Sequence, residues 1–161
     1  MKRLRDFDKN VPIIDRFIQI EAIKLAERHN GYYNYLQQEY ERKNKRILDA
    51  PPKKITPPIY WKEDKKFNPY YVLKHYKQIS KSIRKKINNG TYKPYPAYQH
   101  EIPKSDGKKR IVNIYQIPDA AVSNYLYYKL LSKNKHRFSY YAYAYRDDKN
   151  AHYAVQDIAL E

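Results

Sequence analysis

The stretch of sequence best suited to chemistry is IPKSDGKKRIVNI, residues 102–114, in which Lys104, Lys108 and Arg110 surround a single glycine. Lysine supplies a mobile point charge, and arginine supplies a planar fork that can hold two oxygens of one phosphate. If the three side chains converge, the chemistry that they suit is the binding of a polyphosphate. A solvated turn without a ligand is the alternative interpretation, because basic hairpin tips are common.

The turn type decides whether these cations converge. A two-residue turn would pair Lys104 with Lys109 and would place Arg110 on the opposite face of the hairpin. A three-residue loop with a left-handed Gly107 would pair Lys104 with Lys108, so that both lysines share a face with Arg110. We predict the second arrangement. Three cations on one face destabilise an isolated hairpin, and a bound anion would offset that repulsion.

A second group of cations lies on a predicted helix that starts at Asn68-Pro69, a cap followed by proline, and ends at Asn89-Gly90. One face of this helix is apolar at helical spacing: Val72, Tyr76, Ile79, Ile83 and Ile87. The opposite face carries five cations without an acidic neighbour in the helix: Lys74, Lys77, Lys81, Arg84 and Lys85. Such a row suits contact with a phosphate backbone, and the alternative is a solvated surface.

The composition bounds the partners of the chain. Its 161 residues carry a net charge of +16, and residues 51–90 alone hold 11 basic and 2 acidic residues. This uneven excess favours a polyanionic partner, with nucleic acid as the first candidate. There is no cysteine, and the five histidines lack metal-ligand spacing, so that we expect no metal site. No apolar run approaches the ~20 residues of a membrane span, which predicts a cytoplasmic protein without a membrane partner.

The remaining patterns predict mostly helices. A helix over residues 12–29 is expected to stop at Asn30-Gly31, and a second polar helix is expected over 32–49. The stretch 50–69 contains five prolines and predicts an extended connection. Strands are expected at 97–104 and 109–115, and helices at 119–132 and from about Asn150. In the helix at 119–132 four residues are expected to face inward: Val122, Tyr125, Leu126 and Leu130.

Two motifs resemble a known family. The segment IPKSDGKKRIVNIYQIPDAAVSNYLYYKLL is similar to the first fingers motifs of bacterial reverse transcriptases, which run I-P-K-x-x-G-x-x-R, an I-P turn, an Asp and a helix. Further on, SYYAYAYRDDKNAHYAV resembles the next motif, S-Y-G-F-R-P-G-R-S-A-H-x-A. The resemblance covers about residues 70–161. Its A-Y-R-D-D form is more similar to the divergent phage-defence and abortive-infection branch than to the group II intron branch.

The resemblance implies a fold and a function. For residues 70–161 it implies a fingers segment in which a β-hairpin packs on helices. The patterns before it predict an N-terminal helical extension (1–49) and a Pro-rich linker (50–69), so that the expected fold class is α+β. By similarity, Lys104 and Arg110 would contact the triphosphate of the incoming dNTP, with Lys108 on the same face. Arg146 would lie near the templating strand. Ala144 in place of the usual Gly, and Asp147-Asp148 in place of Pro-Gly, depart from the motif at this template contact.

The sequence Tyr145-Arg146-Asp147-Asp148 spells Y-x-D-D, the metal-binding signature of this family, but we do not interpret it as catalytic. Metal-binding aspartates must lie on a tight hairpin between apolar strands, whereas these precede a helical pattern in which acids serve as caps. We therefore expect the palm and its catalytic aspartates to be absent, so that this chain alone would not polymerise DNA. The complete enzyme would use Mg²⁺, an RNA template, a DNA product and a palm that a partner chain could supply.

Two further functions stay open at this point. The first is a nonenzymatic RNA-binding module that uses the basic helix and exposed tyrosines. The second is an assembly subunit of a defence complex. The reading frame beyond residue 161 would discriminate, because the polymerase interpretation expects palm strands and a second Y-x-D-D there.

Overall fold

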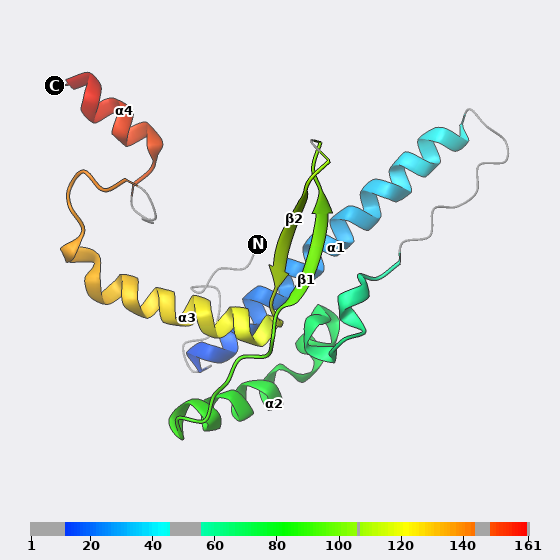
Figure 1. The fold of residues 1–161 in the computed structure, drawn as a ribbon, viewed down its shortest axis with the longest axis horizontal. Coiled ribbons are helices and arrows are strands. Elements are labelled where there is room, and N and C mark those ends of the chain that lie inside the picture. The colour runs from blue at the N-terminus through cyan, green and yellow to red at the C-terminus, as the bar shows by residue number, and fades with distance from the viewer. Residues whose placement is uncertain (1–11, 46–55, 106, 144–148, 161) are drawn as a thin grey trace. The chain divides into compact units, whose positions relative to one another are not determined.

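The computed structural model describes residues 12–45, 56–105, 107–143 and 149–160, which form an α+β fold (Figure 1). The described elements are α1 (Ile13–Asn44), α2 (Pro69–Asn88), β1 (Tyr98–Pro103), β2 (Lys109–Ile114), α3 (Ile117–Asn134) and α4 (Ala151–Leu160). The strands form one antiparallel pair. The chain divides into two compact units, Met1–Tyr125 and Leu126–Glu161. In the described part of the chain no helix combines the length and apolarity that a membrane span requires.

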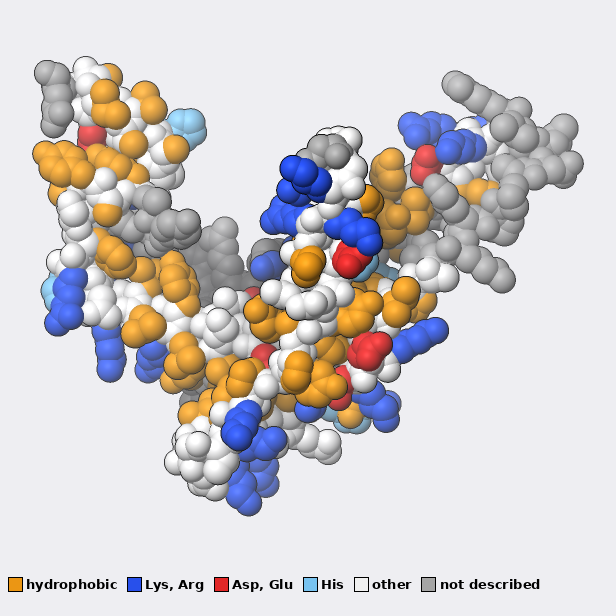
Figure 2. Space-filling view, viewed as in Figure 1, with side chains coloured by type: hydrophobic (Ala, Val, Ile, Leu, Met, Phe, Trp, Pro, Cys, Tyr) orange, Lys and Arg blue, Asp and Glu red, His pale blue; other side chains and the backbone are white. Residues whose placement is uncertain are grey.

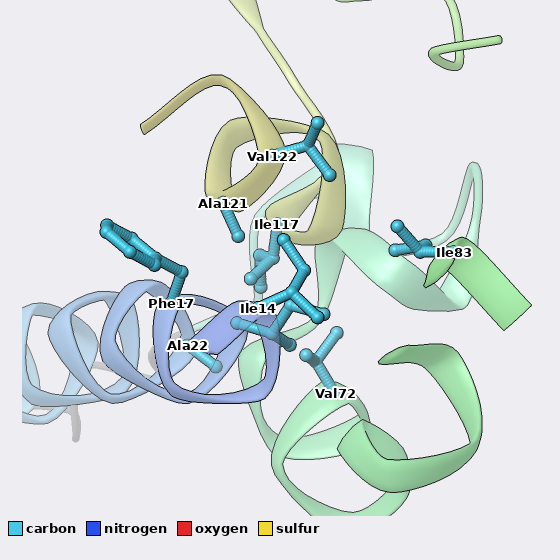
Figure 3. Packing of buried hydrophobic residues seen from close by; sticks show 9 residues of the cluster. Ile14, Phe17, Ala22, Val72, Ile83, Ile117, Ala121 and Val122 are labelled. Carbon is cyan, nitrogen blue, oxygen red and sulfur yellow. The ribbon is translucent and has the colours of Figure 1, made fainter. Parts of the chain in front are cut away.

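The core lies in the first unit and draws on three helices (Figure 3). Helix α1 contributes four side chains, α2 two and α3 three: Ile14, Phe17, Ile18 and Ala22; Val72 and Ile83; and Ile117, Ala121 and Val122. The Tyr125 ring packs edge-on against Phe17, with 5.9 Å between the centroids. The N-terminal helix is therefore part of the same core as the helices on either side of the hairpin.

Helix α1 is continuous, and the predicted stop at Asn30-Gly31 is wrong. Gly31 is helical, and the only described glycines with a positive φ are Gly90 and Gly107. A glycine inside a helix costs only about 1 kcal/mol relative to alanine, which the flanking turns can offset. Asn30 has a tertiary role instead, because its side chain accepts a hydrogen bond of 2.6 Å from the Tyr70 hydroxyl. Residues 46–49 of the predicted second helix lie outside the described residues.

Helix α2 has the predicted ends. The Asn68 side chain accepts a hydrogen bond of 2.9 Å from the Tyr70 backbone N–H, and Pro69 occupies the first helical position. Gly90 follows the helix with φ +66°, the left-handed conformation that glycine favours. The apolar face packs on the core except at Ile87, which is exposed.

The connection before α2 is folded where the structure describes it. Two 3-10 turns, Ile59–Trp61 and Lys65–Phe67, replace the predicted extended segment. Phe67 is buried, whereas Ile59 is 70% exposed. Trp61 packs against His29, with 4.9 Å between ring centroids. The described part of this stretch therefore packs on α1 through Trp61 and His29.

The inward face of α3 is shorter than predicted. Val122 is buried and Tyr125 packs on the core, but Leu126 and Leu130 are 54% and 63% exposed, so the prediction that they face inward is wrong. The core ends at Tyr125, while the helix continues to Asn134. Helix α4 has no buried residue, and its apolar side chains Val155, Ile158 and Leu160 are exposed.

Candidate nucleotide and nucleic-acid interface

The hairpin has the predicted three-residue loop. Pro103 lies opposite Lys109 in the strand register. One step further towards the tip, the Lys104 N–H donates to the Lys108 carbonyl at 2.8 Å. The Gly107 N–H donates to the Lys104 carbonyl at 3.2 Å, and Gly107 has φ +78°. Lys104 therefore pairs with Lys108, and the prediction of a left-handed Gly107 is confirmed.

This register separates the cations of the tip into two faces. Arg110 lies opposite Ile102, two positions from the Lys104–Lys108 pair, so that Lys104, Lys108 and Arg110 share one face. Lys109 lies on the other face, where its ammonium group contacts the Glu101 carboxylate at 2.6 Å. Among the described residues no carboxylate forms an ion pair with Lys104 or Arg110. The positive charge on the first face is therefore not compensated by Glu101.

The hairpin projects from the core (Figure 1), so the prediction that it packs on helices is wrong along most of its length. Only Tyr98, Val112 and Ile114 are half-buried, while the other strand residues are exposed. The Tyr98 ring lies 5.9 Å from that of Tyr60, which attaches the base of the hairpin to the turn before α2. Figure 2 shows Lys and Arg side chains gathered at the free tip.

Four of the five cations predicted on α2 are exposed and form no ion pair with any described residue: Lys74, Lys77, Lys81 and Lys85. Arg84 differs, because its Nε lies 3.7 Å from Oδ1 of the buried Asp15. Asp15 also accepts a hydrogen bond from the Ser80 hydroxyl. The sequence of α2 alone gives this row no acidic neighbour, which predicts a surface without salt bridges. The predicted row without an acidic neighbour is thus wrong at Arg84, because α1 brings a carboxylate to that position.

The predicted template contact, Arg146, lies outside the described residues, as do Ala144, Tyr145, Asp147 and Asp148. The residues on either side of this segment lie together, since the Lys149 ammonium is 4.6 Å from the Tyr143 ring centroid and 3.7 Å from that of Tyr140. The Tyr143 hydroxyl donates to the Asp157 carboxylate, which raises the pKa of Tyr143 to about 12. The flanking residues Tyr143 and Lys149 therefore contact each other within the second unit.

Asn150 is the cap of α4. Its side-chain oxygen accepts hydrogen bonds from the backbone N–H groups of His152 at 2.9 Å and Tyr153 at 3.2 Å. Asn150 therefore occupies a capping position, while Asp147 and Asp148, which the sequence predicts as caps, lie outside the described residues. In the described ranges no three His, Cys, Asp or Glu side chains are grouped as a metal site would require.

Sequence reasoning missed a cavity of about 220 Å³ where the hairpin joins the helices. Asp119 holds its wall, because this carboxylate accepts a hydrogen bond from the Tyr92 hydroxyl and another of 2.9 Å from the Tyr95 N–H. Burial, and then the neighbouring Asp119 carboxylate, raise the pKa of Tyr92. The cavity is also lined by Gln116 and three lysines. The only sequence signal for it is the I-P-D start of α3, which does not indicate a ligand.

No model of a known protein family matches this chain, and no curated protein sequence matches it. The resemblance to reverse transcriptases therefore depends on the residues of the two motifs alone.

Proposed function

We propose that residues 70–161 are the fingers region of an RNA-directed DNA polymerase of the divergent phage-defence type. The observation that carries the proposal is the register of the hairpin, which brings Lys104 and Arg110 of the I-P-K-x-x-G-x-x-R motif to one face of a projecting tip. That arrangement supports a triphosphate site, because the motif and the geometry point to the same two side chains.

In this proposal the incoming dNTP presents its triphosphate to the tip of the hairpin. Lys104 and Arg110 lie on a cross-strand diagonal, a separation within reach of long side chains. Arg110 holds two oxygens of one phosphate, and the Lys104 ammonium neutralises the next one along the chain of phosphates. Each charge-assisted hydrogen bond contributes roughly 1.5–3 kcal/mol. Lys108 adds a third positive charge on the same face.

The template–primer contacts are assigned to α2 and to Arg146. The row from Lys74 to Lys85 extends about 16 Å along the helix axis at ~1.5 Å per residue. A nucleic-acid strand advances ~3.4 Å along its axis per phosphate, so that the row can follow several consecutive phosphates. Arg84 joins the row with the exposed part of its side chain, which is 43% exposed beside Asp15.

Polymerisation itself is assigned to a palm with two Mg²⁺ ions held by aspartates, supplied by a partner chain or by another segment. The second unit exposes apolar side chains that such a palm could cover, which supports this assignment: Leu126, Leu130, Val155, Ile158 and Leu160. We place the activity in the cytoplasm, in defence against phage, as the likeness to that branch suggests.

Equilibrium binding of a fluorescent dNTP to the chain with an RNA template–DNA primer tests the proposal. Arg110→Ala and Lys104→Ala should each weaken dNTP binding about tenfold or more, as the loss of one charge-assisted hydrogen bond predicts. Lys109→Ala is the matched control, because it removes the same charge from the opposite face of the same strand pair. If all three variants lost the same amount of dNTP affinity, the tip would attract the nucleotide only through its overall positive charge. If Arg110→Ala lost no dNTP affinity, the triphosphate site would be rejected.

A nonenzymatic RNA-binding module is the second candidate. The four exposed lysines of α2 favour it, because they form a phosphate-binding row that needs no nucleotide. Exposed tyrosines such as Tyr32, Tyr35 and Tyr115 add surfaces on which bases can stack. RNA binding without any dNTP binding would favour this module over the polymerase fingers.

A further inference from the structure

The cavity at the base of the hairpin is lined by four segments of the first unit, one of which is the 3-10 turn that holds Lys66. The end of α2 contributes Ile83 and Lys86, the chain leading into β1 contributes Lys93, and the start of α3 contributes Gln116 and Asp119. Its volume of about 220 Å³ is several times the ~30 Å³ that a water molecule occupies in the liquid. The cavity therefore has room for a small polyatomic group.

Gln116 gives this cavity an unused donor. The residue is only 2% exposed, and its buried Nε2 has no hydrogen-bond partner among the described residues. A buried amide N–H without an acceptor costs free energy, so native structures supply one from protein, water or ligand. Gln116 lines the cavity, but its Nε2 is closed to solvent in this conformation, so a rotation of the side chain would bring the donor to a ligand oxygen there.

The charged residues that line the cavity favour an anionic ligand. Lys66, Lys86 and Lys93 line it, and none of them forms an ion pair with a described carboxylate. The only acidic residue in its wall is Asp119, whose two oxygens already accept from Tyr92 and Tyr95. Gln116 directly precedes α3, an 18-residue helix whose amino end adds a positive partial charge.

We propose that this cavity binds a phosphate group, with Gln116 as the buried donor and Lys66, Lys86 and Lys93 as the counter-charges. Phosphate matches these features because it presents several acceptor oxygens and a negative charge in a volume that the cavity can hold. The group could belong to free phosphate or to a nucleic-acid backbone, and the chemistry is the same. The base of β1 is about 20 Å from Lys104 at ~3.4 Å per residue, so this site is distinct from the hairpin tip.

Inorganic phosphate is the first probe, added to the ¹⁵N-labelled full chain at constant ionic strength with chloride as the matched anion. We expect phosphate, and not chloride, to shift the signals of the Gln116 side-chain amide and of the backbone amides of Tyr92, Lys93 and Tyr95. Gln116→Glu keeps the size of the side chain, removes the donor and adds a negative charge, so that it should weaken phosphate binding at least tenfold. Equal shifts with chloride, or undiminished binding to Gln116→Glu, would overturn the proposal.

The double substitution of Lys86 and Lys93 by Gln guards against misfolding, because both side chains are exposed and leave the core unchanged. It should also weaken phosphate binding at least tenfold, and unchanged binding would count against the site. Lys104→Ala should leave phosphate binding at the cavity unaltered; a similar loss there would assign the phosphate to the hairpin tip and reject the cavity.

A second arm adds a short single-stranded RNA to the phosphate-saturated protein. Displacement of the phosphate-shifted Gln116 signals, with RNA affinity lowered in Gln116→Glu, identifies a backbone phosphate as the source. If the RNA leaves these signals unchanged, a small phosphate compound is the source. The cavity site holds under both results. The proposed polymerase function could fail at Arg110 while phosphate binding at Gln116 persists.

Discussion

At the scale of single residues, the buried Asp15 is the most consequential charge in the first unit. It lies on α1 between core residues, is only 5% exposed, and accepts a hydrogen bond from Ser80 of α2. Arg84 lies 3.7 Å away, and its Nε makes no hydrogen bond with any described residue. Ser80 and Asp15 therefore fix how α1 meets α2.

Asp15→Ala should lower the free energy of unfolding by about 2–4 kcal/mol, because it leaves the buried Ser80 hydroxyl without an acceptor and Arg84 without its counter-charge. Arg84→Ala should cost only about 1 kcal/mol, since the guanidinium group is partly in water. Urea unfolding measures both values. Glu27→Ala, an exposed carboxylate on the same helix, is the control and should change stability by less than about 0.5 kcal/mol. A value for Asp15→Ala as small as the control would contradict this account.

The residues that sequence could predict are those set by local geometry. Lys104, Lys108 and Arg110 share a face because a glycine and a turn length fix the register within a few residues. Asp15 meets Ser80 and Arg84 only through helix packing across more than 60 positions of sequence. The cavity beside Gln116 likewise draws on four separate segments, and no local pattern indicates that.

At the scale of elements, α1 continues past its predicted stop signal, whereas α2 ends at its own. Both Asn30-Gly31 and Asn89-Gly90 predict a helix end, yet only Gly90 adopts the left-handed conformation. Burial distinguishes them. Leu36, which follows Gly31, is buried, and its burial stabilises the continued helix α1. No residue in the first turns after Gly90 is buried, so that a longer α2 would not be stabilised in this way. The sequence shows the tendency of an Asn-Gly pair to end a helix, and tertiary packing decides whether the helix ends there.

Gly31→Ala should therefore raise the free energy of unfolding by about 0.5–1 kcal/mol, because an added Cβ meets no atom within 4 Å and alanine favours the helix. Gly90→Ala is the matched comparison and should lower it by about 1 kcal/mol, since an L side chain is strained at φ +66°. Thermal or urea unfolding of the two variants gives both signs. A destabilised Gly31→Ala would mean that the helix ends at this glycine.

The lysine row of α2 also belongs to the scale of elements. Substituting Lys74, Lys77 and Lys81 by Gln should reduce the slope of log K against log salt for RNA binding by up to about 0.7 per lost phosphate contact on a single strand. A variant with Lys43, Lys62 and Lys133 changed to Gln has the same net charge and serves as the control. Fluorescence anisotropy over a range of salt concentrations measures the slopes. Equal slopes for the two variants would mean that the lysine row is a solvated surface that does not contact RNA.

At the scale of the whole molecule, the sequence predicts the α+β class and most element positions because periodicity and turn residues are local signals. It did not predict that α1, α2 and α3 share one core, since their apolar faces are equally compatible with separate packing. Nor could it predict where that core ends, because Leu126 and Leu130 continue the apolar pattern of α3 beyond the last partner that covers it. The ranges 1–49, 50–69 and 70–161 stay a prediction.

A chain ending at Asn134 tests the independence of the core. The buried hydrophobic residues of the described chain all lie between Ile14 and Val122, and α4 contains none. The shortened chain should therefore unfold within about 1 kcal/mol of the full chain, the range expected when only surface groups are lost.

The same truncation should reduce exposed apolar surface. It removes Val155, Ile158 and Leu160, so the binding of a hydrophobic dye and self-association should both decrease. The full chain with Val155, Ile158 and Leu160 changed to Ser is the matched control, and it should show a similar decrease with the second unit retained. A loss of more than about 2 kcal/mol on truncation, absent from that control, would show that residues 135–161 stabilise the core through contacts other than these apolar side chains.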